Sequence, residues 1–431
     1  MNYHRSLYRL ALFFLLLSLQ GFLLYGQFES GTILGSVRDP TNSAVAGAPV
    51  TLTNVKTGAA LKTATDGNGN YEFVNQHVGS YSVKVEAAGF QTSTTDPFDL
   101  VVNARQRVDI SLKVGQSSQN ITVSDAVSLL ETDNSSRGQV IHPKQIVDLP
   151  LNGRSYADLT LLVPGVAKSF LENQSDSSRD ASFNVNGQRS ELNNFLLDGV
   201  DNNSYGTSNQ GFSNQVIQPN PDALAEFKVE TNNYSAEYGR STGAVINATI
   251  KSGTNSLHGE AWEFLRNTDL NAVGFFKPVN GTKPPFNQNQ FGVAAGGPVL
   301  KDKIFVFGDY EGFRRVFHPV QFATVPLPAF KAGNFGVPIK NPYTGEIYAN
   351  GVVPASQITP FAKAVLAGLP DPNLPGTSNN YESSPSDTTS SDKGDLRYDQ
   401  YIGQKSTTVA RNSQGDIRIF SPADIPEPVC R

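Results

Sequence analysis

A serine within a glycine-flanked motif is the first feature whose residue types and spacing could support chemistry. Residues Gly239-Arg-Ser-Thr-Gly243 match the G-x-S-x-G pattern, in which a serine on a sharp strand-to-helix turn attacks an ester or amide carbonyl. That geometry requires a helix after the serine, whereas the following run Ala244–Lys251 is strand-like. The downstream histidines, His258 and His318, have no acidic partner at a suitable position. The motif therefore favours a structural turn, and we expect no enzyme activity and no catalytic residue.

Acidic and amide side chains at Asp66, Asn68 and Asn70 imitate the start of a calcium-binding loop. Such a loop needs glycine at its sixth position and glutamate at its twelfth, but the chain has Tyr71 and His77 there. Turn formation explains this run better than metal binding. The sequence contains no H-E-x-x-H motif, P-loop or G-x-G-x-x-G motif, and it has a single cysteine, Cys430. We therefore expect no metal site, no cofactor and no disulfide.

The composition limits the fold class and the partners. The chain has 431 residues, of which 17% are charged, with 38 glycines and 26 prolines. Its length suggests two or three domains, and its many turn-forming residues favour β-structure over helical bundles. A net charge of −5 argues against nucleic-acid binding, because a nucleic-acid binder carries a dominant basic surface.

Residues 1–26 have the pattern of a signal peptide for export through the Sec pathway. Arg5 and Arg9 form a short basic region, and an apolar run from Leu10 to Leu24 follows. Polar residues interrupt this run, which is shorter than the roughly 18–20 unbroken apolar residues of a spanning helix. An uncleaved membrane anchor is the alternative. We expect cleavage near Gly26-Gln27.

Residues 27–114 are expected to fold as a seven-stranded β-sandwich. Short runs with a period of two are separated by turn clusters, as in Gly79–Val85, where Tyr81 and Val83 alternate with polar residues. The runs Gly35–Asp39, Pro49–Leu52, Thr65–Phe73 and Gly79–Val83 resemble the carboxypeptidase regulatory-like domain. This resemblance implies a starch-binding-like sandwich fold and, through that fold, carbohydrate binding.

Residues 115–258 carry the most informative pattern. The spacing predicts a short helix over 142–150, a short amphipathic run over 156–163, and strands over 182–187, 194–201 and 244–251. An Asp-Gly turn lies within the run 194–201. The runs Gln145–Tyr156, Asn186–Arg189, Phe195–Asp201 and Tyr234–Asn247 resemble the plug domain of TonB-dependent outer-membrane receptors, specifically the Oar-like branch, in which a regulatory-like sandwich precedes the plug. The structural motif residues that this resemblance selects are Asn152, Gly153, Arg154, Asn186, Gly187, Asp198, Gly199, Tyr238, Gly239 and Arg240.

The resemblance also implies a contact segment for TonB, the protein that transmits energy from the inner membrane. This segment would comprise Ile121, Thr122, Val123, Ser124 and Asp125. An extended, β-branched segment of this kind can add to the sheet edge of another protein. An ordinary first strand of the plug domain is the alternative interpretation of the same residues.

Residues 259–431 are expected to begin a transmembrane β-barrel without completing it. Strand-like runs over 259–266, 289–296, 304–312, 395–402 and 406–411 suit such a barrel, and a long Pro/Ser-rich loop is expected at 316–392. A soluble β-domain is the alternative. These runs give five to seven strands, whereas plugged outer-membrane transporters use roughly 22. The fold class expected for the whole chain is mainly β: a sandwich, an α+β plug domain, and the first strands of an incomplete barrel.

Taken together, the resemblance implies a TonB-dependent receptor in the outer membrane of a diderm bacterium, gating ligand uptake by movement of its plug. Its expected partners are TonB, outer-membrane lipid and an unidentified extracellular ligand, either a glycan or a peptide. The alternative is a secreted or periplasmic carbohydrate- or peptide-binding or adhesion module with no pore.

Overall fold

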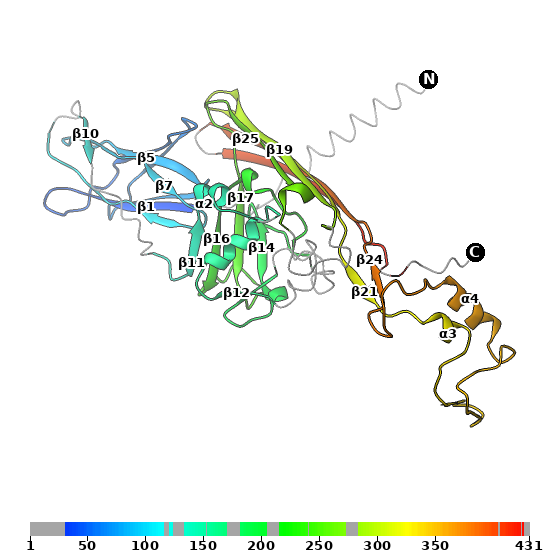
Figure 1. Cartoon of the computed structure of the whole chain (residues 1–431). Coiled ribbons are helices and arrows are strands. Elements are labelled where there is room, and N and C mark those ends of the chain that lie inside the picture. The colour runs from blue at the N-terminus through cyan, green and yellow to red at the C-terminus, as the bar shows by residue number, and fades with distance from the viewer. Residues whose placement is uncertain are drawn as a thin grey trace, which may run out of the picture. The chain divides into compact units, whose positions relative to one another are not determined.

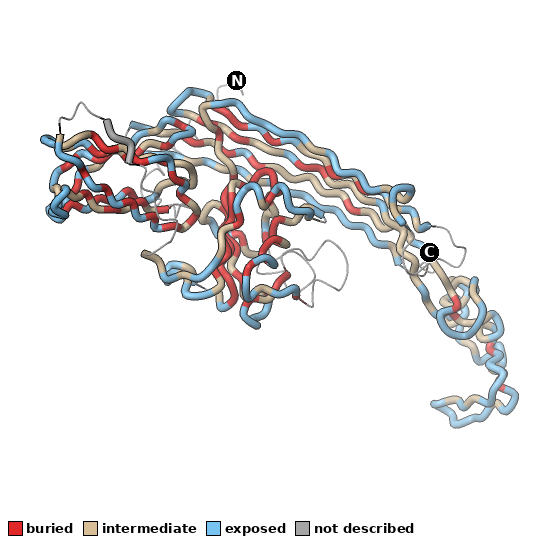
Figure 2. The backbone as a smooth tube through the Cα atoms, turned by 60° about the vertical axis from the view of Figure 1, so that its left-hand side comes forward, coloured by how far each residue is buried: buried red, intermediate tan, exposed pale blue. Residues whose placement is uncertain are grey.

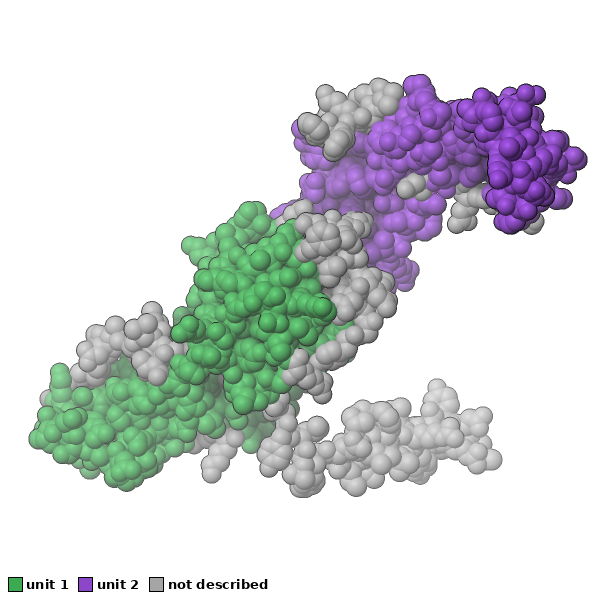
Figure 3. Space-filling view, turned by 90° about the horizontal axis from the view of Figure 1, so that it is seen from below, with its two compact units in different colours: residues 1–258, 295–308, 395–413 green, residues 259–294, 309–394, 414–431 purple. Residues whose placement is uncertain are grey.

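The computed structural model describes residues 31–115, 120–123, 133–151, 153–169, 182–204, 215–239, 241–272, 283–403, 406–423 and 425, with the backbone alone at 120–123. The predicted signal peptide, Ser124, Asp125, Asn152, Arg240 and Cys430 lie outside the described residues. The chain divides into two compact units (Figure 3). The first contains the described residues up to His258 together with 295–308 and 395–413, and the second contains 259–294, 309–394 and the residues from 414 onward.

Strands dominate the described residues, and the predicted mainly β fold class is confirmed (Figure 1). The α-helices are α2 (Pro143–Asp148), α3 (Pro328–Lys331) and α4 (Pro360–Gly368), and each begins at a proline, whose fixed φ suits the first helical turn. Short 3₁₀ helices are η1 (Tyr156–Leu162), η3 (Ser190–Leu192), η4 (Pro221–Ala223) and η5 (Thr268–Leu270). Within the described ranges, no helix is both long and apolar enough to cross a membrane.

The N-terminal sandwich consists of two sheets around one apolar core. Its strands are β1 (Gly31–Arg38), β2 (Pro49–Asn54), β3 (Ala60–Ala64), β4 (Asn70–Gln76), β5 (Gly79–Val85), β6 (Thr92–Thr95), β7 (Phe98–Leu100), β8 (Arg105–Arg107), β9 (Ile110–Ser111) and β10 (Asn120–Val123). One sheet has the order β4-β1-β8, with β9 also on β1; the other has the order β10-β6-β5-β2-β3, with β7 also on β5. Alternate residues such as Ile33, Val50 and Val83 are fully buried between them.

The sandwich contains more strand segments than the seven that the sequence predicts, because longer runs are interrupted. Pro97 separates β6 from β7, since proline has no N–H to donate within a ladder. The predicted turn at Asp66 is also observed: its carboxylate accepts the backbone N–H groups of Asn68 and Asn70 at 2.9 and 2.8 Å. Within the described residues, no cluster of three or more His, Cys, Asp or Glu side chains could hold a metal ion.

The next sheet, called the plug sheet here after the sequence resemblance, has the strand order β11-β16-β17-β14-β15. Its strands are β11 (Arg137–Ile141), β14 (Asn194–Leu197), β15 (Val200–Asp201), β16 (Leu224–Asn232) and β17 (Val245–Ile250); β12 (Val166–Lys168) and β13 (Phe183–Val185) form a separate pair. All six residues of β17 are buried (Figure 2). Tyr156 of η1 packs edge-on against Phe227 of β16 with ring centroids 5.2 Å apart. The helix and 3₁₀ segments thereby cover one face of this sheet.

The remaining long strands form a five-stranded sheet, called the barrel sheet, in the order β18-β19-β20-β25-β26. These strands are β18 (His258–Asn267), β19 (Phe286–Leu300), β20 (Ile304–Phe317), β25 (Asp387–Ile402) and β26 (Ser406–Phe420); shorter pairs are β21 (Gln321–Ala323) with β24 (Tyr381–Ser383) and β22 (Ile339–Lys340) with β23 (Ile347–Tyr348). On β25, Asp395, Arg397 and Asp399 are buried, whereas Leu396 is 60% exposed. Buried polar residues alternating with exposed apolar ones are typical of a strand in an outer-membrane barrel.

One boundary of the predicted long loop at 316–392 differs in the structure. Residues 387–392 belong to β25, although the serine- and threonine-rich run had suggested a flexible loop. The Arg314 guanidinium donates to both carboxylate oxygens of Asp392, at 2.8 and 2.9 Å, and to the Ser391 carbonyl oxygen at 2.8 Å. Small β-branched or hydroxyl side chains fit a strand as readily as a loop, so contacts from another strand determine the outcome here.

Candidate functional site

A tight turn places Asp198 at one end of the plug sheet. Asp198 and Gly199 link β14 to β15 and have φ values of 48° and 71°, as a two-residue hairpin turn of this hand requires. The Asp198 backbone N–H donates to the Ala248 carbonyl oxygen at 2.9 Å, and the Ile250 N–H donates to the Asp198 carboxylate at 3.0 Å. The end of β17 therefore fixes the carboxylate in place.

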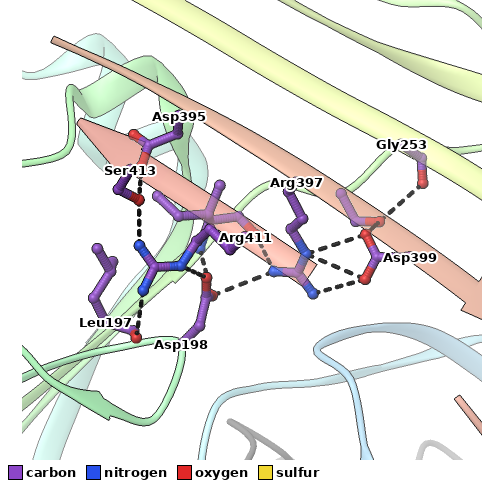
Figure 4. A network of polar contacts seen from close by, with 10 residues as sticks. Leu197, Asp198, Gly253, Asp395, Arg397, Asp399, Arg411 and Ser413 are labelled. Atoms are coloured by element: carbon purple, nitrogen blue, oxygen red, sulfur yellow. Dashed lines mark hydrogen bonds and ion pairs between the residues drawn. The ribbon is translucent and has the colours of Figure 1, made fainter. Parts of the chain in front are cut away.

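Two guanidinium groups from the barrel sheet meet this carboxylate (Figure 4). Arg411 of β26 approaches one carboxylate oxygen of Asp198 through Nε at 2.8 Å, and Arg397 of β25 approaches the other through Nη1 at 3.3 Å. Arg397 also donates to the Ile250 carbonyl oxygen at 2.7 Å, and Arg411 donates to the Leu197 carbonyl oxygen at 3.2 Å. The two arginines thus bind both the side chain and the backbone of the plug sheet.

A second carboxylate, Asp399, balances the charge of Arg397. Its oxygens accept from Arg397 Nε and Nη2 at 3.1–3.2 Å, and Ser252 Oγ donates to it at 2.7 Å. Asp198, Arg397, Asp399 and Arg411, called the ionic network below, contain two negative and two positive groups. Side-chain exposure does not exceed 17% for any of the four.

Burial raises the pKa of the Asp198 carboxyl above its ordinary value, while the guanidinium groups of Arg397 and Arg411 act in the opposite direction. A buried ion pair of this kind adds little net stability compared with apolar packing, but losing one partner leaves an uncompensated buried charge. Removing any one of the four side chains would therefore leave an uncompensated charge where the plug sheet contacts β25 and β26.

A second junction joins the sandwich to the plug sheet around Asn103, which has a φ of 55°. The Val102 N–H donates to Glu226 Oε1 at 2.5 Å, and Asn103 Oδ1 accepts from Asn247 Nδ2 at 3.2 Å. Lys228 donates to the Asn103 carbonyl oxygen at 3.5 Å and pairs with Glu230 at 3.3 Å. Burial raises the pKa of Glu226 to about 7, and Asp99 contributes in the same direction. Charged side chains on β16 are therefore buried at this junction.

A cavity of about 550 Å³ adjoins both junctions within the first unit. His77 of the sandwich lines it together with Glu226, Arg397 and Asp399. Burial lowers the pKa of the His77 imidazole to about 4, and Arg397 contributes in the same direction. The imidazole is therefore neutral at neutral pH.

Those other predicted motif residues that the structure describes lie away from the ionic network. The Arg154 guanidinium pairs with Asp222, next to Gly153 in a turn. Asn186 and Gly187 form a turn with positive φ, and Asn186 Nδ2 donates to the Thr231 carbonyl oxygen at 2.9 Å. Burial raises the pKa of the Tyr238 phenol, which precedes Gly239 in the loop between β16 and β17. These residues shape turns, and only Asp198 and Gly199 belong to the turn that meets the network.

The Asn186 turn and the loop from β16 to β17 together line a second cavity of about 510 Å³. Its walls contain Asn186, Gln188, Asn232, Asn233, Tyr234 and Thr242, none of which is charged. Ser241, the serine of the G-x-S-x-G pattern, lies beside it, but its hydroxyl donates to the Leu192 carbonyl oxygen at 2.7 Å, and a strand follows it. The hydroxyl is therefore engaged in holding the loop.

The segment predicted to contact TonB lies partly within the described residues. Ile121, Thr122 and Val123 belong to β10, which pairs in parallel with β6 of the sandwich. Sequence reasoning did not identify Glu226, Arg397, Arg411 or His77. Charged residues at every second position of β16, namely Glu226, Lys228 and Glu230, were the available signal, and they would ordinarily indicate a solvent-facing side.

Three family models match consecutive parts of the chain. Residues 32–113 match a carboxypeptidase regulatory-like domain, 131–245 match a TonB-dependent receptor plug domain, and 249–429 match an outer membrane beta barrel domain. The TonB-dependent transporter Oar of Myxococcus xanthus is 27% identical over 341 residues, which cover 74% of this chain and 30% of the relative. The chain therefore spans about 30% of the length of that curated relative.

Parts of two solved structures are also similar to parts of this chain. The outer membrane transporter YddB of Escherichia coli is 15% identical with a TM-score of 0.39, covering 63% of this chain and 31% of its own. A mutant ferric enterobactin receptor of Pseudomonas aeruginosa in complex with enterobactin is 11% identical with a TM-score of 0.37. The match covers 67% of this chain and 34% of the receptor chain. The three domain matches, in this order and together with the Oar relative, place the chain among the TonB-dependent outer-membrane receptors of the Oar-like type.

Proposed function

We propose that this chain supplies the sandwich, the plug and barrel strands of a TonB-dependent transporter that gates ligand uptake by plug movement. The proposed parts are a signal peptide at 1–26 for Sec export, the sandwich at 27–114, the plug at 115–258 and barrel strands from 259 onward. The family is located in the outer membrane, so the lipid of that membrane would surround the barrel strands.

The ionic network carries this proposal. A plug must be held in one position at rest and must separate from the barrel wall when the gate opens. On the plug sheet, the Asp198 carboxylate and the Ile250 carbonyl oxygen act as acceptors. Arg397 of β25 binds both of these acceptors, and Arg411 of β26 binds the carboxylate. Because water solvates separated charges well, an ionic contact opens at a lower cost than an apolar contact of equal area. The network therefore suits a contact that must break and form again.

The cavity beside Asn186 and Tyr234 supports a neutral, hydrogen-bonding ligand. Amide, hydroxyl and phenol groups line it, and none of the lining residues is charged. These groups match the hydroxyls of a glycan or the backbone of a peptide. The proposed ligand therefore belongs to one of these two classes.

The proposed energy-supplying partner is TonB, acting on the segment Ile121–Asp125. No nucleic acid is expected as a partner, and no catalysis is proposed. For the G-x-S-x-G motif, which is typical of hydrolases, the absence of proposed catalysis is supported by the hydrogen bond that the Ser241 hydroxyl donates to the Leu192 carbonyl oxygen.

Fractionation of the full chain, expressed with its own N-terminal segment in a diderm bacterium, tests the proposal. We expect the protein in the outer-membrane fraction, with the plug protected from added protease. Protein found only in the soluble periplasm or the medium would instead support the alternative, a secreted glycan- or peptide-binding module. The uncharged cavity is compatible with that alternative, so fractionation is the measurement that separates the two.

A further inference from the structure

A turn of the sandwich contacts the linker at 251–257, which connects the plug sheet to the barrel sheet. The turn joins β2 to β3, and Asn54 Oδ1 shapes it by accepting the backbone N–H groups of Lys56 and Thr57 at 3.0 and 3.1 Å. In the linker, the Asn255 backbone N–H donates to the Lys56 carbonyl oxygen at 3.2 Å, and its Nδ2 donates to the Thr57 carbonyl oxygen at 2.8 Å. Asn255 therefore binds two successive carbonyl groups of the sandwich.

The same asparagine also binds the barrel sheet. Its Nδ2 donates to Asp302 Oδ1 at 2.7 Å, and its Oδ1 accepts the Asp302 backbone N–H at 2.9 Å. Asp302 lies in the tight turn between β19 and β20 and has a φ of 63°. Both hydrogens of Nδ2 are engaged, one on each side, so a single amide group joins the sandwich to the barrel turn. Asn255, Asp302 and the carbonyl groups of Lys56 and Thr57 are called the clasp below.

Glycines allow the chain segments around the clasp to approach closely. Gly58 of the sandwich turn has a φ of 71°, and a Cβ there would lie against the Asp302 carboxylate, 3.2 Å from its Cγ. A Cβ on Gly253 of the linker would lie 2.5 Å from the Val306 carbonyl oxygen and 2.6 Å from that of Gly297. The linker therefore runs directly over β19 and β20, and the sandwich turn fits against the end of the same two strands.

We propose that the clasp is a latch, which holds the sandwich to the barrel turn and thereby resists movements of the sandwich that would act on the plug. The sandwich contacts the plug sheet at a separate place, where the Val102 N–H donates to Glu226. Lys56 and Asp302 are exposed, so water can replace the hydrogen bonds of the clasp when it opens. This inference rests on the proposed function, in which the plug moves relative to the barrel.

The variant Asn255→Asp opens the clasp with a small change of shape. The introduced carboxylate has no hydrogen to donate to the Thr57 carbonyl oxygen, and it repels the carboxylate of Asp302. Hydrogen exchange of the full chain, measured by mass spectrometry, is followed in the peptide that contains Val102. Its exchange should accelerate at least tenfold, because the sandwich is then held at one contact instead of two. Ser256→Ala, an exposed position in the same linker, is the matched control and should leave this exchange unchanged.

A second variant separates a latch from a local role of the linker. Asn255→Asp/Asp302→Asn restores a donor and an acceptor between linker and barrel turn, but leaves the Thr57 carbonyl oxygen without its side-chain donor. Exchange at Val102 should therefore stay fast, and exchange in β5 should match the unmodified protein because the sandwich core remains folded. Wild-type exchange at Val102 in this double variant, or unchanged exchange in Asn255→Asp, would overturn the proposal. Equal acceleration in β5 would show that the sandwich itself unfolds, and would overturn it as well.

A disulfide in place of the clasp provides the opposite perturbation. Cβ atoms joined by a disulfide lie about 3.5–4.5 Å apart, so Gly58→Cys/Asp302→Cys, made with Cys430→Ser, can lock the two turns together. Exchange at Val102 should be at least tenfold slower in the oxidised protein than in the same protein after reduction. Equal exchange in the two forms, or failure of the pair to cross-link, would refute the latch. Fractionation tests the proposed function separately, so a chain that reaches the outer membrane without any of these changes at Val102 would refute the latch alone.

Discussion

Replacing Asp198 with asparagine tests whether the ionic network holds the plug sheet against the barrel strands. Asparagine preserves the shape of the side chain, and its carbonyl oxygen can still accept the Ile250 N–H. The substitution removes the negative charge between Arg397 and Arg411, whose side chains are 5% and 17% exposed. Arg397 then keeps Asp399 as a carboxylate partner, whereas Arg411 keeps its contacts with the Ser413 hydroxyl and the Leu197 carbonyl oxygen.

The free-energy change caused by Asp198→Asn depends on which contacts of the two arginines remain after the substitution. Breaking a buried ion pair by removing one partner costs roughly 3–5 kcal/mol. Arg397 keeps its contacts with Asp399 and with the Ile250 carbonyl oxygen, so the lower end applies. We expect Asp198→Asn to lower the free energy of opening at this junction by about 3 kcal/mol, which corresponds to roughly a 100-fold change in the opening equilibrium.

Hydrogen exchange measured by mass spectrometry on the full chain provides the assay. The Ile250 amide donates to Asp198, so peptides covering 245–250 report the junction directly. Their exchange should accelerate about 100-fold in Asp198→Asn. Asp416→Asn is the matched control, because Asp416 pairs with Arg418 at 3.0 Å with both side chains at least 60% exposed. Such a pair contributes about 0.5 kcal/mol or less. Unchanged exchange in Asp198→Asn, or equal acceleration in the control, would refute the assignment of a holding role.

Three further predictions concern the sandwich and its junction. Burial raises the pKa of Glu226 to about 7 from an ordinary 4.5, so ionisation of this carboxyl opposes folding. The free energy of unfolding, measured in urea, should therefore fall by about 3 kcal/mol at most as the pH rises between these values, and Glu226→Gln should lack this decline. Burial lowers the pKa of His77 from 6.5 to about 4, so protonation of the imidazole opposes folding, and the free energy of unfolding should fall as the pH drops from 6.5 to 4. Adding His77→Gln to the Glu226→Gln variant should remove this fall. A fall of the same size in the double variant would contradict the prediction. A Cβ on Gly35 would lie 1.9 Å from the Val108 carbonyl oxygen, so Gly35→Ala should cost about 1–3 kcal/mol in thermal unfolding, whereas Gly67→Ala, with open space around it, should be near neutral.

Local patterns in the sequence predict the features that depend on neighbours along the chain. Alternation predicts strands such as β5, because a period of two places Tyr81, Val83 and Val85 on the buried face. The Asp198-Gly199 pair predicts its turn, since these residue types tolerate positive φ. The order of the domains was predicted from the resemblance to Oar-like receptors, because no single local pattern indicates it.

The ionic network could not be predicted in this way, because its members are far apart in sequence. Asp198 and Arg397 are separated by 199 positions, and only the folded sheets bring them to 3.3 Å. The buried charges on β16 were obscured for a related reason. Alternating Glu226 and Lys228 indicate a polar face, but the pattern does not say whether water or another domain covers that face. The sandwich covers it at Asn103.

Two adjacent strands of the plug sheet, β16 and β17, connect these junctions. Glu226 and Lys228 of β16 meet the sandwich, and Lys228 aligns with Asn247 of β17, which also contacts Asn103. Three residues further along β17, Ile250 contacts Arg397 with its carbonyl oxygen and Asp198 with its N–H. Because adjacent strands in a ladder move together, a displacement of the sandwich loads the same pair of strands that the ionic network restrains. Under the proposed function, a movement of the sandwich would therefore act on the plug through these two strands. The contacts at Asn103 and at Asp198 involve different residues, so each can be weakened by substitution without altering the other.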